Sequence, residues 1–133
     1  MEIVIDTSVV IGFLRGHEPE ASLLAQLVTD GRAMLTAVTV FELESGLRGY
    51  DQLLNQIATF SEVMPVLPLD LESARRAGQE ERRLRQRGVA VGVADVLIAG
   101  ICLARKRPLL TLNREHFSRI DGLRVLTPNR MES

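Results

Sequence analysis

The amino-acid sequence predicts an α/β domain with a mostly parallel central sheet of about five strands and helices on both faces. One observation leads to this prediction, and a second to that of a single domain. Short β-branched runs alternate with longer segments that have apolar residues at helical spacing, a pattern typical of right-handed β-α-β units. The 133 residues contain no repeat, low-complexity stretch or linker, so we expect residues 1–133 to form a single domain.

The first half of the chain predicts two strands and four helices. Glu2–Ile5 is a β-branched run that we expect to form the first strand, followed by a helix from about Ser8 to Arg15. Pro19 lies at the first position of a second helix, and Gly31 ends that helix. The remaining expected elements are a strand at Ala33–Leu35 and helices at Val38–Leu47 and Tyr50–Val63.

The second half of the chain predicts three more strands and three more helices. We expect Asp70 to cap a long helix that runs to about Arg87 and is stopped by Gly88. The segment Val93–Arg105 is apolar almost all round, as in a helix buried in the middle of a domain. The other expected elements are strands at Pro65–Leu67, Leu109–Thr111 and Arg124–Leu126 and a short helix near Arg114–Ser118.

Composition and charge narrow the classes of function. Aromatic residues make up 4% of the chain and Trp is absent, which argues against a surface that binds nucleic acid by base stacking. The formal net charge is −1, so any contact with RNA or DNA has to come from a local basic patch.

The sequence is typical of a cytoplasmic protein. Cys102 is the single cysteine and cannot form an internal disulfide, which fits a reducing compartment. The N-terminal segment lacks the basic region and the long apolar region of a signal peptide. No apolar stretch reaches the ~20 residues that a membrane span requires. We therefore expect a cytoplasmic protein with no membrane segment.

Polar side chains follow two of the predicted strands at the carboxyl ends, where open α/β sheets bind their ligands. Asp6 comes directly after Ile3–Ile5, and Asn113 lies just beyond the strand that ends at Thr111. Each has a simpler explanation. Asp6 or Ser8 can cap the next helix, and Asn113 is a common turn residue.

Two further acids, Glu42 and Asp95, lie on predicted helices. The face of Glu42 carries small residues such as Thr39, Ser45 and Gly46, which leave room to approach the carboxylate. A buried carboxylate needs a cation or an Arg partner, so a structural salt bridge is the alternative. Asp95 opens the apolar helix, where the alternative is stabilisation of the helix dipole or capping of backbone N–H groups.

The three acids and Asn113 together supply oxygen donors and no sulfur donor. Such a set suits hard cations such as Mg²⁺ or Mn²⁺, whereas zinc prefers His and Cys. Carboxylates at close range repel each other without a cation. A divalent ion held there polarises a phosphate and lowers the pKa of a bound water, so the expected chemistry is hydrolysis of a phosphodiester.

In their order and spacing, several segments of the chain resemble the PIN domain, and specifically the VapC-type ribonuclease toxins of bacterial and archaeal toxin–antitoxin pairs. The resemblance covers roughly Ile3 to Leu126 and implies a single PIN-like domain. The matching segments are Ile3–Ser8, Thr39–Gly46, Val93–Ala99, Leu110–Phe117 and the closing-strand pattern Gly122–Leu126.

The resemblance implies a metal-dependent endoribonuclease with Mg²⁺ as the cofactor, for which Mn²⁺ substitutes. Asp6, Glu42 and Asp95 fall on the catalytic acids that bind the metal. Asn113 falls on the catalytic position where many PIN domains carry a fourth Asp, and this departure puts a second metal site in doubt.

The resemblance also implies supporting residues and partners. Ser8 and Thr111 fall on small hydroxyl positions that steady the acids. The implied substrate is RNA, and the implied assembly is a homodimer bound by a small antitoxin of the VapB kind. In that family a basic side chain of the antitoxin often reaches toward the acids.

Arginines are concentrated on the predicted helix that follows Asp70. Between residues 75 and 87, six Arg and two Glu give a local charge of +4. Arg82, Arg85 and Arg87 are nearest the loop before Asp95, which makes them candidates for contacts with RNA phosphates. The alternative is a solvated helix with Glu–Arg pairs at helical spacing.

Two other functions compete with a nuclease. Phosphatases of the haloacid-dehalogenase kind use an Asp nucleophile and need a second acid two residues later, where this chain has Ser8. They also need a Lys after a later strand, whereas Lys106 precedes one. The second competitor is an RNA-binding module on a degenerate nuclease fold, which Asn113 favours and the three intact acids oppose.

Overall fold

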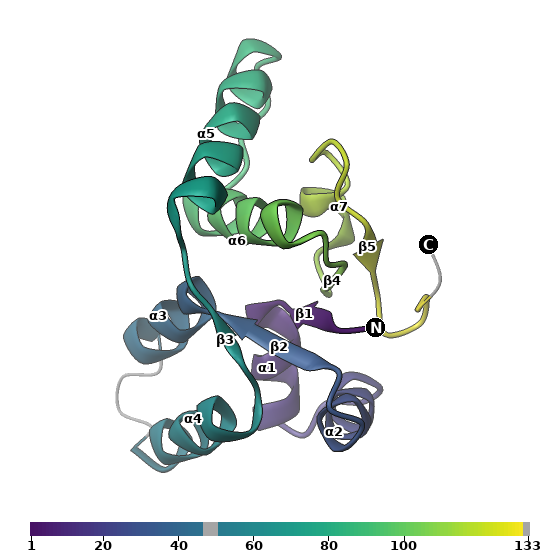
Figure 1. The fold of residues 1–133 in the computed structure, drawn as a ribbon. Coiled ribbons are helices and arrows are strands. Elements are labelled where there is room, and N and C mark those ends of the chain that lie inside the picture. Colours follow the sequence, from purple (N-terminus) through teal and green to yellow (C-terminus); the bar gives the residue numbers. More distant parts are fainter. Residues whose placement is uncertain (47–50, 132–133) are drawn as a thin grey trace.

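The structure is a computed structural model that describes residues 1–46 and 51–131. Its centre is a sheet whose strands are all parallel, in the order β3-β2-β1-β4-β5. The strands are β1 (Ile3–Ile5), β2 (Ala33–Thr36), β3 (Val66–Leu67), β4 (Leu109–Leu110) and β5 (Val125–Leu126). The predicted α/β class and the number of strands are therefore confirmed (Figure 1).

Seven helices are present within the described residues. They are α1 (Thr7–Leu14), α2 (Glu20–Thr29), α3 (Ala37–Gly46), α4 (Asp51–Val63), α5 (Leu71–Gln86), α6 (Val93–Arg105) and α7 (Arg114–Phe117). The predicted ends differ from these bounds by one or two residues, since helix ends fray and have no sharp sequence signal. The predicted end at Leu47 and the predicted start at Tyr50 fall outside the described residues.

Two predicted helix boundaries have a clear physical cause in the structure. The Asp70 side chain accepts a hydrogen bond of 2.9 Å from the backbone N–H of Ser73, so Asp70 caps α5 as predicted. Gly88, just after α5, has a φ of +69°, a left-handed conformation that disfavours residues with a Cβ. Because a residue in the left-handed conformation cannot be part of a right-handed helix, α5 ends before Gly88.

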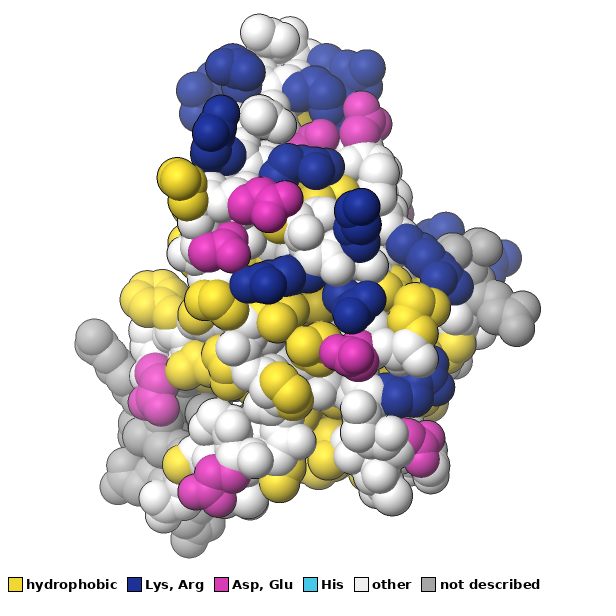
Figure 2. Space-filling model, viewed as in Figure 1, with side chains coloured by type: hydrophobic (Ala, Val, Ile, Leu, Met, Phe, Trp, Pro, Cys, Tyr) yellow, Lys and Arg dark blue, Asp and Glu magenta, His cyan; other side chains and the backbone are white. Residues whose placement is uncertain are grey.

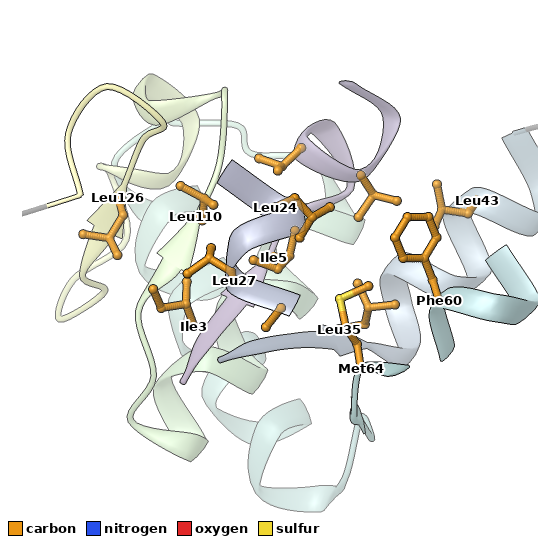
Figure 3. Close-up of a cluster of buried hydrophobic side chains, with 13 residues drawn as sticks. Ile3, Ile5, Leu24, Leu27, Leu35, Leu43, Phe60, Met64, Leu110 and Leu126 are labelled. Atoms are coloured by element: carbon orange, nitrogen blue, oxygen red, sulfur yellow. The ribbon is translucent and has the colours of Figure 1, made fainter. Parts of the chain in front are cut away.

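Hydrophobic side chains pack on both faces of the sheet. Ile3 and Ile5 of β1 belong to one buried cluster with residues of α1, α2 and α4, which Figure 3 shows from close by. Val4, which points to the other face of the same strand, belongs to a second cluster with residues of α5, α6 and α7. Helices therefore cover both faces, and β1 lies buried between them.

Helix α6 is fixed in place by a very close contact with α5. A Cβ placed on Gly100 of α6 would lie 2.5 Å from the backbone oxygen of Ser73 and 2.7 Å from the Cβ of Ala77. Only a glycine permits the two helices to come this close. The contact holds the start of α6, with its Asp95, at the carboxyl end of the sheet (Figure 1).

In residues 1–46 and 51–131 we find no helix with both the length and the apolar character needed to cross a membrane.

Candidate active site

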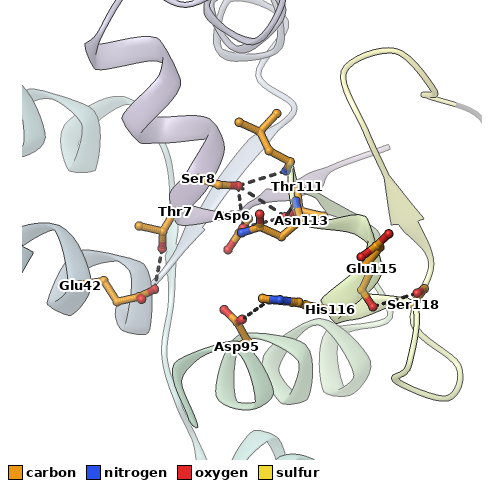
Figure 4. A network of polar contacts seen from close by, with 11 residues as sticks. Asp6, Thr7, Ser8, Glu42, Asp95, Thr111, Asn113, Glu115, His116 and Ser118 are labelled. Atoms are coloured by element: carbon orange, nitrogen blue, oxygen red, sulfur yellow. Dashed lines mark hydrogen bonds and ion pairs between the residues drawn. The ribbon is translucent and has the colours of Figure 1, made fainter. Parts of the chain in front are cut away.

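Asp6 lies at the carboxyl end of β1, and its side chain is held by two hydroxyl groups (Figure 4). Its Oδ2 accepts hydrogen bonds from Ser8 Oγ at 2.8 Å and from Thr111 Oγ1 at 2.7 Å. The residue is 2% exposed. Although Asp6 precedes α1, its side chain makes no capping bond to that helix. The alternative that Asp6 merely caps α1 is therefore wrong.

The same two hydroxyls tie the loop after β4 to Asp6. The backbone N–H of Leu112 donates to Ser8 Oγ at 3.1 Å, and that of Asn113 donates to Thr111 Oγ1 at 3.0 Å. Because each hydroxyl donates to the carboxylate and accepts from the loop, Asn113 is carried next to Asp6 by a continuous set of hydrogen bonds.

Glu42 lies on α3, the helix that directly follows β2, and its side chain lies on the same side of the molecule as Asp6 (Figure 4). Thr7 Oγ1 donates to Glu42 Oε1 at 2.7 Å and lies 3.0 Å from Thr39 Oγ1. The N–H of Thr39 in turn donates to Thr36 Oγ1 at the end of β2. No ion pair joins Glu42 to a basic side chain within the described part of the chain, so the structural salt bridge is not formed there.

Asp95 lies in the first turn of α6 and completes the group of acids. Gly92 is the residue at the capping position, and no side chain caps this helix. Capping by Asp95 is therefore wrong, whereas its place in the first turn fits the other part of that alternative, stabilisation of the helix dipole. The Asp95 Oδ2 atom instead lies 3.5 Å from His116 Nδ1, which comes from α7.

The three acids are close enough to influence one another's protonation. Loss of solvation raises the pKa of Glu42, the hydrogen bond from Thr7 opposes this, and the charges of Asp6 and Asp95 raise the pKa further. Loss of solvation also raises the pKa of Asp95, as does the charge of Asp6, while His116 acts in the opposite direction. The site thus concentrates three carboxylates, of which only Asp95 has a basic side chain, His116, beside it within the described residues.

Each acid keeps one oxygen available to a ligand. Ser8 and Thr111 occupy Oδ2 of Asp6, Thr7 occupies Oε1 of Glu42, and His116 lies beside Oδ2 of Asp95. Within the described residues the second oxygen of each accepts no hydrogen bond, and none of the three is sealed from solvent. The negative charge of the three carboxylates and their oxygens without a hydrogen bond both fit a hard cation.

No three His, Cys, Asp or Glu side chains among residues 1–46 and 51–131 are close enough to enclose an ion by themselves. The oxygen donors of Asp6, Glu42 and Asp95 fit Mg²⁺, which keeps several waters and uses one or two carboxylates as direct ligands, better than they fit zinc, which prefers nitrogen and sulfur. The residues present therefore suit a hydrated Mg²⁺ or Mn²⁺.

The predicted arginines lie at the C-terminal end of α5. Arg82 and Arg85 are in the last turns of this helix, and Arg87 follows it. Arg85 lines a pocket with Val93, Val96 and Leu97 of α6. The Nη2 atom of Arg85 pairs with Glu81 at 3.2 Å. A role for these arginines in RNA binding stays a prediction.

Thr7 is the site residue that the sequence prediction missed. It lies between Asp6 and Ser8, both of which were selected, and it alone holds Glu42. The sequence offered one signal for polar neighbours of Glu42, because the helical period places Thr39 on the same face of α3. The hydrogen bond from Thr7 to Glu42, however, joins residues 35 positions apart. Periodicity within one helix cannot reveal such a contact.

Comparisons with known proteins agree with this arrangement. The family model described as PIN domain matches residues 3–123. Ribonuclease VapC19 of Mycobacterium tuberculosis is 35% identical over 115 residues, which are 86% of this chain and 90% of the relative.

Two solved structures resemble the fold. VapBC2 from Rickettsia felis, bound to a DNA fragment from its promoter, aligns with a TM-score of 0.84 at 20% identity and covers 96% of this chain and 98% of its own. VapBC-5 from Mycobacterium tuberculosis, described as a member of the VapBC family of toxin–antitoxin systems, aligns with a TM-score of 0.66 at 27% identity and with coverage of 96% and 98%. The sequence match and the shared fold show that the chain belongs to the PIN domain family, and within it to the VapC proteins.

Proposed function

We propose that the protein is a metal-dependent endoribonuclease and the toxin of a toxin–antitoxin pair. One observation supports this most strongly. Asp6, Glu42 and Asp95 converge from β1, α3 and α6, each keeps one oxygen free of hydrogen bonds, and burial together with the neighbouring acids raises the pKa of Glu42 and of Asp95. The relative named a ribonuclease, at 35% identity, supports RNA as the substrate.

The chain's own residues would prepare the site for hydrolysis. Asp6, Glu42 and Asp95 would hold a hydrated ion, one or two of them directly and the rest through its waters. When bound, Mg²⁺ or Mn²⁺ supplies positive charge to the phosphate and a more acidic water. Ser8 and Thr111 fix the orientation of Asp6, so that little reorganisation is needed when substrate enters.

Asn113 would contribute the fourth polar side chain beside Asp6. The loop that carries it is held by Thr111 through the 3.0 Å bond from its N–H. As an amide it adds a carbonyl oxygen and no charge, so it suits one ion better than two.

The partners belong to the same proposal. Structures that share the fold are described as VapBC, and one of them as a member of a toxin–antitoxin family. We therefore propose that a small VapB-like antitoxin binds this protein and that the protein forms a homodimer. A cytoplasmic location follows from this role, because the RNA and the antitoxin are found there.

Two competing functions are less consistent with the structure. In a phosphatase with an Asp nucleophile, a Lys would have to reach Asp6, but Lys106 follows the far end of α6. A binding module without activity would have no need for three acids whose charges oppose one another. Asn113 is the one residue that favours such a module.

Cleavage of RNA tests the proposal. The purified chain is given fluorescent single-stranded and structured RNAs with Mg²⁺, with Mn²⁺ or with a chelator. We expect internal cleavage with either metal, none with the chelator, and a loss of at least about a hundredfold in Asp6→Asn and Asp95→Asn. Glu44→Gln, an exposed acid on α3, is the matched control and should retain activity. Tight RNA binding without cleavage under every condition would support the binding module instead.

A further inference from the structure

A basic pocket lies at the opposite end of α6 from the acids. Its volume is about 360 Å³, and it is formed where α6 ends, where β4 begins and where the chain enters β5. Among residues 1–46 and 51–131, four of its lining side chains are basic, namely Arg76, Lys106, Arg107 and Arg124, and none is acidic. In a chain with a net charge of −1, this is a marked local excess of positive charge. Figure 2 shows Lys and Arg side chains along α5 and around the end of α6.

Two of the cations of this pocket, Arg76 and Lys106, form no ion pair within the described part of the chain, and a third, Arg107, is paired only weakly. The Nη2 atom of Arg107 lies 3.8 Å from Glu2 Oε1, at the outer limit of an ion pair. No acidic side chain in the described part of the chain pairs with Arg76 or Lys106. Since like charges around one pocket repel each other, an anion bound between them would be favoured.

Lys106 occupies a position where the backbone favours glycine. Three other helices are followed by a glycine in the left-handed region, with φ of +70° at Gly16, +67° at Gly31 and +69° at Gly88. Helix α6 instead ends at Lys106 with a φ of 55°, and this is the single Lys of the chain. A side chain in this conformation is disfavoured, which points to a use for its ammonium group.

The size and the walls of the pocket indicate the ligand. Leu103, Pro108 and Leu123 provide apolar surface between the basic side chains. A volume of about 360 Å³ lies in the ~300–1,000 Å³ range of small-molecule sites. A phosphate would pair with the cations, and an attached sugar or base would cover the apolar wall.

We propose that this pocket binds the phosphate of a nucleotide unit. Lys106 follows Asp95 by eleven positions along α6, which is about 16 Å along the helix axis, so the bound phosphate is distinct from the one cleaved at the acids. The nucleotide is either a remote part of an RNA or a free nucleotide. Binding of a remote part of an RNA rests on the proposed ribonuclease function, whereas binding of a free nucleotide does not.

Binding is measured on the full chain with a chelator present, so that it does not depend on cleavage. Isothermal titration uses inorganic phosphate and AMP, and fluorescence anisotropy uses a single-stranded oligoribonucleotide. The variants are Lys106→Gly and Arg76→Ala, with Arg15→Ala as the matched control because Arg15 is exposed and lies outside the pocket. Lys106→Gly removes the ammonium group and also relaxes the backbone, so its thermal midpoint should not fall.

The proposal expects Lys106→Gly and Arg76→Ala each to weaken binding about tenfold, because each removes a charge-assisted contact, while Arg15→Ala changes it by less than about twofold. If the oligoribonucleotide is affected and AMP does not bind, the source is RNA. If AMP is affected and the oligoribonucleotide is not, the source is a free nucleotide. The proposal is overturned if neither probe binds, or if Lys106→Gly binds both as the native chain does. Absence of RNA cleavage would leave the AMP result intact, so the two proposals fail separately.

Discussion

The hydroxyl of Thr111 donates a 2.7 Å hydrogen bond to Oδ2 of Asp6, joining residues 105 positions apart in the sequence. The bond is buried, since Thr111 is 0% exposed and Asp6 2%. It fixes which oxygen of Asp6 faces the protein, and it leaves the other for a ligand. The orientation of the central acid is therefore determined by the far end of the chain.

Removal of this hydroxyl should weaken the site without unfolding the protein. In Thr111→Val the shape is retained, but Asp6 Oδ2 keeps only Ser8 as a donor. We expect a loss of about 10–100-fold in cleavage or metal affinity, as is usual for residues that orient ligands. The measurement is cleavage rate against Mg²⁺ concentration. Thr29→Val, at an exposed threonine, is the control and should behave as the native chain.

Neutralising Glu42 should stabilise the metal-free protein at neutral pH. The folded state raises the pKa of Glu42 above 4.5, so folding favours the protonated form, and stability is lost as pH rises through the raised value. Glu42→Gln removes that cost and still accepts the bond from Thr7. With a chelator present, its thermal midpoint should exceed that of the native chain at pH 7.

The same comparison at low pH provides the check. At a pH well below 4.5 the native Glu42 is protonated in both the folded and the unfolded state, so the advantage of Glu42→Gln should vanish. Glu44→Gln changes an exposed acid on the same helix and should give no such pH-dependent gain. A gain that persists unchanged at pH 3 would show that charge repulsion is not its cause.

Divalent ions should stabilise the native chain through the acids. An ion that binds the folded state alone stabilises it by mass action, by about 2.7 kcal/mol at a concentration a hundredfold above the dissociation constant. We expect Mg²⁺ or Mn²⁺ to raise the thermal midpoint of the native protein and to raise that of Asp6→Asn much less. Equal shifts in the two proteins would place the ion elsewhere.

The close contact between α5 and α6 should be intolerant of a single methyl group. In Gly100→Ala the added Cβ meets the backbone oxygen of Ser73 at 2.5 Å, so the helices must move apart. We expect a loss of about 1–3 kcal/mol in unfolding free energy, measured by denaturant titration. Gly78→Ala is the matched control, because nothing lies within 4 Å of its added Cβ and it should be neutral or stabilising.

Local signals in the sequence were sufficient for the elements of the fold. Gly31 and Gly88 end helices because of their left-handed backbone, and Asp70 begins one through its side chain, so neighbours in sequence determine these boundaries. The parallel direction of the strands followed from the alternation of strands and helices, whereas their order in the sheet was not predicted.

The detailed geometry of the site depended on contacts that no local pattern contains. The three acids were selected because strand ends converge at one edge, yet the donor to Glu42 is Thr7, 35 residues away. The alternatives for Asp6 and Asp95 as helix caps were locally reasonable, and only the observed orientation of their side chains excludes them. The roles of Asn113 and of the arginines on α5 remain predictions.

The position of β1 between β2 and β4 has a consequence for synthesis on the ribosome. A nascent chain that has emerged only as far as β3 already contains Asp6 and Glu42, but it lacks Asp95 and the Thr111 hydroxyl. Strand β4 pairs with β1 only after residue 110 is available. We therefore expect a chain that ends before β4 to lack nuclease activity, because it has neither the strand that pairs with β1 on that side nor the hydroxyl that orients Asp6.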